Sequence, residues 1–261
     1  MTPPTRAPAE AGSGPPDPVT AELAACRREL EQLQRDFDGF NYAVAHDLRA
    51  PLRAVGGFLD ALNEDYVRHL PAPAQAYLQR ARDSTGRAQR MLDALLQLSR
   101  LGRQRLEQEV TSLSTLADEV RQELMRDAAE RVIEWRTGPL PTVTCDRRLC
   151  HELFAQLFAN AIKFTAGQPR AVIEVFVREG TIPPVVVVRD NGVGFNAARA
   201  EHLFMPFARF HPPQAFEGIG AGLALAAKIV RRHGGQIGVE SVEGGGATFH
   251  FTLSAGPASP V

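Results

Sequence analysis

The sequence predicts a fold of the α plus α/β class, in which an antiparallel helical hairpin dimerises into a four-helix bundle and is followed by an α/β sandwich domain. Apolar residues recur at alternating spacings of 4 and 3 from Val19 onward, and a second stripe of this kind runs from about 74 to 101. From about 110 to 256, apolar strand-like runs are mixed with helical segments. The two stripes indicate paired helices, and the mixed segments indicate a separate domain.

The first helix is expected over residues 19–68, with a local flaw at Pro51 because proline has no N–H to donate to the preceding turn. A turn at 69–73 connects it to the second helix at 74–101. One hairpin leaves its apolar stripe half uncovered, so we expect a homodimer. The stripe of the first helix contains Val19, Leu23, Cys26, Leu30, Leu33, Phe37, Phe40 and Val44.

The second domain is expected to begin, after residue 110, with a helix at 114–130 that has Ser114 as its N-cap. Further helices are expected at 146–164 and 221–233. Strands are expected at 131–136, 171–178, 185–190, 236–242 and 246–253.

Composition excludes several classes of function. A net charge of −1 and a pI of about 6.7 give no broad basic field for nucleic acid. No apolar run approaches the roughly 20 residues that span a bilayer. The three cysteines, Cys26, Cys145 and Cys150, form no CxxC pair and suit reduced thiols. We therefore expect a soluble, cytoplasmic protein, with a disordered Pro-rich and Ala-rich N-terminus at 1–18.

His46 is the candidate reactive residue of the first helix. It lies about 200° around the helix from the apolar stripe, so its imidazole is expected to face solvent rather than the partner helix. Asp47 follows it, and a neighbouring carboxylate favours one tautomer and leaves the other ring nitrogen nucleophilic. Taken alone, the pair is equally compatible with an ordinary solvated helix face.

The segment 185–195 suggests a nucleotide site. An apolar strand leads to Asp190, which is able to accept a hydrogen bond from an exocyclic amine, and to Gly192 and Gly194, which allow a ligand close to the backbone. Asp-Asn-Gly is also ordinary turn chemistry. The two glycines and Ala197 match a loose dinucleotide fingerprint, but the two prolines that follow and the lack of a second strand argue against that fold.

Two further segments supply polar groups suited to phosphate. On the helix at 146–164, Gln156, Asn160 and Lys163 share one face, where an amide oxygen is able to hold Mg²⁺ and the lysine to contact phosphate. Gly218, Gly220 and Gly222 precede a helix whose free N–H groups suit phosphate as well. The plainer alternative for the helix is an amphipathic helix with one solvent-exposed polar face, and for the glycines it is a flexible hinge. No P-loop sequence occurs.

These motifs, in this order, resemble those of the sensor histidine kinases of two-component systems, and within them the phytochrome-like branch. The resemblance runs from about residue 38 to 254. His46 to Pro51 look like the H-box and Asn160 to Phe164 like the N-box. Asp190 to Phe195 look like the first glycine box, Phe204 to Phe210 like the phenylalanine box of the lid, and Gly218 to Leu223 like the second glycine box.

The resemblance implies a signalling coiled coil at 19–38, a dimerisation and phosphotransfer domain at 39–103 and a Bergerat-type ATP-binding domain at 110–256. It implies that His46 takes the γ-phosphoryl group of ATP with help from Asp47, and then passes it to an aspartate of a separate response regulator. Asp190 is then the adenine contact, Asn160 the Mg²⁺ ligand and Lys163 a phosphate contact. A lid at about 204–220 with Arg209, together with Gly192, Gly194, Gly218, Gly220, Gly222 and Leu223, completes the implied ATP site.

Three positions depart from the family pattern. Gln156 replaces an Asn or acidic residue and is a further possible metal ligand, which implies reduced rather than absent kinase activity. Ala221 replaces a bulkier apolar residue in the second glycine box. Ala50 stands where many relatives carry Thr or Asn to position a hydrolytic water, so phosphatase activity is expected to be weak.

Alternatives from other classes remain. One is a catalytically reduced dimeric scaffold or phosphotransfer module, and another is a serine-directed kinase or simple ATPase on the same nucleotide fold. No input domain is recognisable before the coiled coil. An upstream sensor protein acting near residues 1–35, by shifting the register of the coiled coil, is therefore the expected input route.

Overall fold

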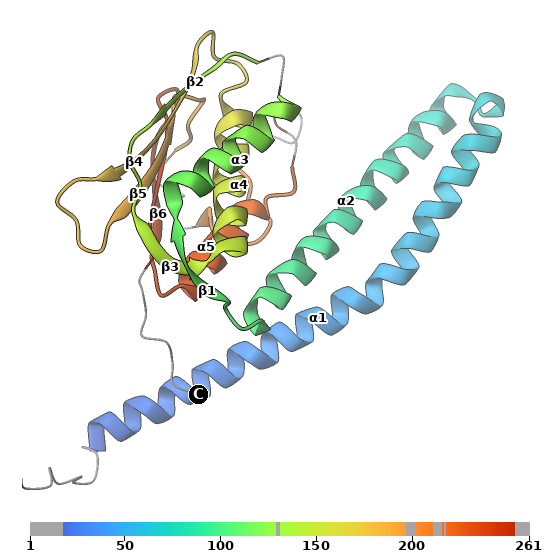
Figure 1. Cartoon of the computed structure of the whole chain (residues 1–261). Helices are drawn as coiled ribbons and strands as arrows, with labels where there is room; N and C mark the ends of the chain where they lie inside the picture. Colours follow the sequence, from blue (N-terminus) through green and yellow to red (C-terminus); the bar gives the residue numbers. More distant parts are fainter. Residues whose placement is uncertain (1–17, 129–130, 197–201, 211–215, 217, 254–261) are drawn as a thin grey trace, which may run out of the picture.

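The computed structural model describes residues 18–128, 131–196, 202–210, 216 and 218–253. Of the N-terminus expected to be disordered at 1–18, residues 1–17 lie outside this part of the chain, whereas Pro18 is the first residue of a helix. The last two residues of the helix expected at 114–130 also lie outside it. Figure 1 shows a long helical hairpin beside a domain in which helices pack on a sheet. The predicted fold class is confirmed in this outline.

The hairpin consists of α1 (Pro18–Tyr66), a short 3₁₀ turn (Val67–His69) and α2 (Ala72–Arg103). Helix α1 continues through Pro51 and curves along its length, as Figure 1 shows. The apolar stripe of α1 is largely exposed in the single chain, and Cys26 is exposed with it. Among the described residues, no helix is long and apolar enough to cross a membrane.

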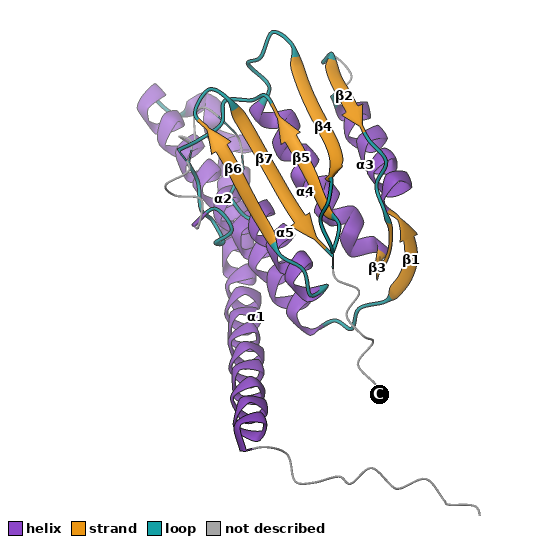
Figure 2. Cartoon of the chain, turned by 90° about the vertical axis from the view of Figure 1, so that its left-hand side faces the viewer, coloured by secondary structure: helices purple, strands orange, loops and turns teal. Residues whose placement is uncertain are grey.

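The second domain contains a five-stranded sheet in the order β2-β4-β5-β7-β6. Strands β2 and β4 are parallel, and the other neighbouring pairs are antiparallel. Figure 2 shows helices covering one face of this sheet. The strands are β2 (Ile133–Thr137), β4 (Ala171–Arg178), β5 (Val185–Asp190), β6 (Ile237–Val242) and β7 (Gly246–Thr252), and the helices are α3 (Leu113–Asp127), α4 (Arg147–Phe164) and α5 (Gly222–Arg232).

The core lies between this sheet and its helices. Alternate residues of the central strands, such as Val186, Val188 and Phe251, face the apolar side of α4, where Phe154 and Phe158 are buried. Burial of each large apolar side chain contributes roughly 1.5–3 kcal/mol to stability. This packing fixes α4 and the end of β5 relative to each other, and both contribute to the site described below.

Two features differ from the sequence-based expectation. A second sheet pairs β1 (Gln108–Ser112) with β3 (Thr142–Asp146), and neither strand was predicted because both are short and polar. The N-cap of α3 is Ser112 rather than Ser114, because β1 runs directly into the helix and the Ser112 side chain accepts the N–H of Thr115. Ser114 instead accepts the N–H of Leu140 at 2.9 Å.

Helix α5 holds the domain against the base of the hairpin. Lys228 on α5 donates to both carboxylate oxygens of Asp38 on α1, at 2.9 and 3.0 Å. A Cβ atom at Gly102 would lie 1.9 Å from the same carboxylate, so a larger residue at the end of α2 would displace the Asp38 side chain of this ion pair. Arg232 donates to the backbone carbonyls of Leu101 and Gln104.

Candidate nucleotide site and phosphoacceptor

The candidate site is a cavity of about 340 Å³ between α4, β5, β7 and the described residues between 203 and 223. Most of the residues predicted to bind nucleotide line this cavity, whereas Gly192 does not. The predicted site residues in its wall are Gln156, Asn160, Lys163, Asp190, Gly194, Arg209, Gly218, Gly220, Gly222 and Leu223.

Asp190, the last residue of β5, provides the acidic end of the cavity. Its side chain is only 4% exposed, and its Oδ1 accepts the N–H of Gly192 at 2.8 Å. Burial raises the pKa of Asp190 to about 6, although backbone hydrogen bonds from Gly192 and Ala247 act in the opposite direction. The carboxylate is therefore charged at neutral pH and is an acceptor that water barely reaches.

The two glycines after Asp190 are needed because backbone approaches them closely. A Cβ atom at Gly192 would lie 2.6 Å from the carbonyl oxygen of Phe164, and the next residue, Val193, donates its N–H to that same oxygen. Gly194 has a φ of 58°, and its Cβ would lie 2.0 Å from the carbonyl oxygen of Val242. In this structure these glycines hold the Asp190 loop against α4 and β6.

Helix α4 places Gln156, Asn160 and Lys163 on one wall, as the spacing predicts. The Gln156 amide nitrogen donates to Glu152, one turn earlier, at 2.7 Å. Burial, and then the charge of Arg209, lower the pKa of the Lys163 ammonium. Two cations that repel each other across a cavity, Lys163 on α4 and Arg209 on the facing segment, are suited to a polyanion such as a triphosphate.

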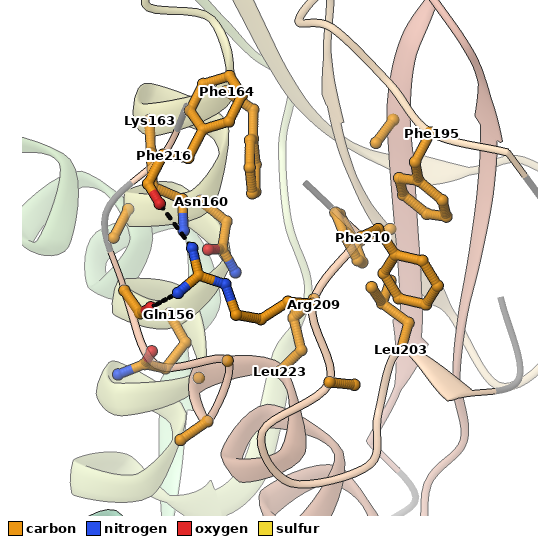
Figure 3. Close-up of a pocket in the computed structure, with 18 of the residues that line it drawn as sticks. Gln156, Asn160, Lys163, Phe164, Phe195, Leu203, Arg209, Phe210, Phe216 and Leu223 are labelled. Atoms are coloured by element: carbon orange, nitrogen blue, oxygen red, sulfur yellow. Dashed lines mark hydrogen bonds between the residues drawn. The ribbon is translucent and has the colours of Figure 1, made fainter. Parts of the chain in front are cut away.

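The segment after residue 202 forms the opposite wall. Arg209 donates to the carbonyl oxygens of Gly218 at 2.5 Å and Phe216 at 2.8 Å, and Figure 3 shows its guanidinium beside Asn160. Phe210 stacks on Phe195 with ring centroids 5.5 Å apart, and Phe216 contacts Phe164 edge to face at 5.0 Å. The lid expected at 204–220 thus lies over the cavity in its described part, while 211–215 and 217 lie outside the described residues.

Glycines also shape the cavity where α5 begins. Gly220 has a φ of 77°, and a Cβ atom there would lie 2.4 Å from the carbonyl oxygen of Ala208. A Cβ atom at Gly222 would lie 2.2 Å from the Gln156 amide oxygen. The N-cap of α5, Ala221, makes no side-chain cap hydrogen bond, so the first N–H groups of the helix keep their capacity to donate to a ligand.

The donors in the cavity fit Mg²⁺ bound together with phosphate rather than a metal held by protein alone. No group of three or more His, Cys, Asp or Glu side chains suited to a metal occurs within the described ranges. Two amide oxygens, those of Asn160 and Gln156, are available in the cavity wall. Mg²⁺ commonly takes one or two protein oxygens and completes its shell with phosphate and water.

His46 lies outside the cavity, on α1. Its side chain is 64% exposed, as predicted, and the Asp47 side chain is 81% exposed. The Nδ1 atom of His46 is 3.2 Å from Oδ1 of Asp47, and the ring stacks on Tyr42 with centroids 6.1 Å apart. An Nδ1–H that donates to Asp47 leaves the lone pair on Nε2 exposed to solvent.

Sequence reasoning missed two residues that hold other groups in place, one within α4 and one between α5 and the start of α4. Glu152 holds the amide of Gln156. His233, which is 3% exposed, faces the Ile229 carbonyl oxygen with Nδ1 at 2.8 Å and accepts the N–H of Asp146 with Nε2 at 3.0 Å. An apolar helix that ends in a histidine does not by itself indicate such a link between α5 and the start of α4.

Comparison with known proteins agrees with this geometry. Residues 38–104 match the model of the His Kinase A (phospho-acceptor) domain, and residues 145–257 match that of the histidine kinase-, DNA gyrase B- and HSP90-like ATPases. The adaptive-response sensory kinase SasA of Synechococcus sp. (strain JA-3-3Ab) is 31% identical over 94% of this chain and 69% of its own length. The chain belongs to the sensor histidine kinases.

Other relatives place this histidine kinase near the phytochrome-like branch. Cyanobacterial phytochrome B of Nostoc sp. (strain PCC 7120 / SAG 25.82 / UTEX 2576) is 38% identical over 89% of the chain, which spans only 31% of that protein. The crystal structure of full-length ShkA in complex with AMPPNP is similar with a TM-score of 0.56 and 25% identity, over 84% of this chain and 47% of the other. The structure of the Acinetobacter baumannii histidine kinase AdeS shares the fold, with a TM-score of 0.51 and 22% identity over 80% of this chain and 98% of its own.

Proposed function

We propose that this chain transfers the γ-phosphoryl group of ATP to Nε2 of His46, and that the phosphoryl group then passes to an aspartate of a separate response regulator. The proposal rests on two features that occur in the same chain. One is the exposed imidazole of His46, which is hydrogen-bonded to Asp47, and the other is a cavity lined by Asp190, Asn160 and Lys163. The intact cavity counts against a decayed nucleotide domain, and the exposed histidine would serve no purpose in a simple ATPase.

In the proposed reaction, the Nε2 lone pair of His46 forms a bond to the γ-phosphorus, and the bond from that phosphorus to the bridging oxygen breaks, so that ADP leaves. The Nδ1–H remains with Asp47, which stabilises the positive charge that develops on the ring. Lys163 and Arg209 offset phosphate charge, and Asn160 would hold Mg²⁺, which would supply further neutralisation of that charge. Asp190 accepts the exocyclic amine of adenine.

Transfer requires the cavity and His46 to come together, because no residue of α1 lines the cavity in the described part of the chain. We propose that the chain works as a homodimer. The apolar stripe of α1 is exposed in the single chain: Leu23 is 67% exposed, and Phe37 and Phe40 are each 66% exposed. A continuous exposed apolar face of this kind is typical of a surface that packs against another helix. A nucleotide domain can then reach the histidine of its own or the partner hairpin.

The decisive experiment incubates purified chain with γ-labelled ATP and Mg²⁺, beside a His46→Gln variant. Wild type is expected to gain a label that is lost in acid and kept in alkali, and the variant is expected to gain none, because glutamine has no nucleophilic ring nitrogen. α-Labelled ATP is the control for simple binding. An acid-stable label would indicate a hydroxyl-directed kinase. An acid-labile label kept in the variant would indicate another acceptor, such as a second histidine, and phosphate release without label would indicate an ATPase.

The pKa of Asp190 predicts a pH dependence of purine binding. Because adenine donates to the ionised carboxylate, affinity is expected to be constant above about pH 7 and to fall as the pH drops through about 6, approaching tenfold per pH unit. Adenosine is the probe, since it has no phosphate whose own titration would confuse the result. Calorimetric titration between pH 5 and 8 measures it, and an unchanged affinity at pH 5 would contradict the role of Asp190.

We also propose that this kinase dephosphorylates its regulator poorly, because exposed Ala50, four residues after His46, has no group to hold a hydrolytic water. Rapid loss of phosphate from a cognate regulator in the presence of this protein and ADP would contradict it.

Helix α1 is continuous from Pro18 past His46, so an upstream protein that rotates the coiled coil at 19–38 would act on the phosphoacceptor through one rigid element. Deletion of residues 1–35 with no change in regulation would count against this input route.

A further inference from the structure

Glu152 is a polar residue of α4 that no sequence motif assigns to the site. We propose that Glu152 is a positioning residue for the metal, which orients the Gln156 amide so that its oxygen, and not its nitrogen, faces the phosphate end of the cavity. The inference rests on the proposed function, because it assigns a role at the same ATP site.

The hydrogen bond between Gln156 and Glu152 determines which way the amide is turned. Nε2 of Gln156 lies 2.7 Å from Oε1 of Glu152, one turn earlier on the same helix. An ionised carboxylate only accepts hydrogen bonds, so it pairs with the NH₂ end of the amide and excludes the flipped orientation. The charge on the acceptor strengthens this preference.

The opposite end of the amide carries the oxygen that a metal requires. Oε1 of Gln156 lies against Gly222, at the start of α5, so closely that a Cβ atom on Gly222 would be 2.2 Å away. Gln156 and Asn160 are one helical turn apart and line the same cavity. No described side chain or backbone group donates a hydrogen bond to this oxygen, which leaves its lone pairs available to a ligand.

The chemistry of the metal decides which end of the amide must face it. Mg²⁺ takes oxygen ligands in a nearly fixed geometry, and an amide that turned its NH₂ group inward would repel it. Glu152 does not itself reach the nucleotide cavity; it lines the groove on the hairpin side, together with Arg49 and Asp93. It therefore acts through Gln156, as an outer-shell partner that fixes a metal ligand.

The experiment compares the affinity of the chain for ADP in Mg²⁺ with its affinity in EDTA, by titration calorimetry. In Glu152→Ala, the gain in ADP affinity due to Mg²⁺ is expected to fall about tenfold, since loss of such outer-shell partners weakens metal binding roughly 10–100-fold. Adenosine affinity, and ADP affinity in EDTA, are expected to stay at the wild-type value. Glu152→Gln keeps an acceptor but adds a donor, so an intermediate gain is expected.

The matched control is Glu123→Ala. Glu123 lies on the neighbouring helix α3 and pairs with His151 of α4 at 3.1 Å, outside the cavity. It should leave the Mg²⁺ effect unchanged, whereas a purely structural role for Glu152 would lower ADP affinity equally with and without Mg²⁺.

Two results overturn the inference in distinguishable ways. An unchanged Mg²⁺ effect in Glu152→Ala, with a clear effect in wild type, overturns the inference alone. A wild-type ADP affinity that is independent of Mg²⁺ overturns it together with the proposed metal site, and a wild type that binds neither ADP nor adenosine overturns the proposed function itself.

Discussion

Asp190→Asn is expected to weaken adenosine binding by about 100-fold while the domain stays folded. The substitution replaces a buried carboxylate, which is 4% exposed, with an amide. It removes a hydrogen bond to a charged acceptor, worth roughly 1.5–3 kcal/mol, and it places an NH₂ donor opposite the adenine amine, which also donates. Folding is spared for two reasons. The asparagine oxygen still accepts the Gly192 N–H, and the penalty of burying a charge, which raises the pKa of Asp190 to about 6, disappears.

Calorimetric titration with adenosine, together with thermal unfolding, measures both effects. Asp146→Asn is the matched control, because Asp146 is equally buried at the end of β3 but caps α4 outside the cavity. Asparagine is an equally good N-cap for the Leu149 N–H, so the control should bind adenosine as wild type does, with a loss of stability of about 1–3 kcal/mol because the Glu107 N–H loses its acceptor. Wild-type adenosine affinity in Asp190→Asn would show that the purine lies elsewhere.

Gly194→Ala is expected to destabilise the nucleotide domain by more than about 4 kcal/mol, a size reached only by a few mechanisms. The residue has a φ of 58°, and a Cβ atom would lie 2.0 Å from the carbonyl oxygen of Val242 and 2.9 Å from that of Gly246. Backbone cannot rotate away as a side chain can, so the loop that carries Asp190 would have to separate from β6 and β7.

Gly244→Ala separates backbone strain from the clash. Gly244 has a φ of 75°, but nothing lies within 4 Å of the position of its Cβ, so its substitution should cost only the left-handed penalty of about 1–2 kcal/mol. Denaturant unfolding followed by tryptophan fluorescence provides both values, since the single tryptophan, Trp135, lies in this domain. Equal destabilisation by the two substitutions would contradict the close contact of the Asp190 loop with β6.

Periodicity was sufficient for the elements whose apolar residues face one side. The heptad stripe predicted α1 and α2 to within a few residues, and the apolar runs predicted β4 and β5 with the observed bounds. Periodicity did not predict β1 and β3, because QEVTS and TVTCD carry few apolar residues. These two strands are stabilised by pairing with each other, although α3 and β2 separate them in the sequence. Periodicity also failed for the N-cap of α3, where Ser112 and Ser114 are equivalent in sequence and only the exit of β1 decides between them.

The contacts of the candidate site also include some that the sequence predicts and some that it does not. Asn160 and Lys163 were predictable as neighbours because helix spacing places them on one face, and Asp190 because it ends an apolar strand; the packing of α4 against β5 then brings them to one cavity. The ion pair of Asp38 with Lys228 joins residues 190 positions apart, and no local pattern indicates it. The role of Glu152 also escaped, since an acidic residue in the first half of a helix is ordinary until the orientation of Gln156 is known.

The central claim is that His46 receives the phosphoryl group of ATP. The direct measurement digests wild-type chain at alkaline pH after incubation with ATP and Mg²⁺, and locates the phosphoryl group by peptide mass spectrometry. We expect one phosphoryl group, on His46, which is released by mild acid. A phosphoryl group on a serine, a threonine or another histidine, with unmodified His46, would contradict it.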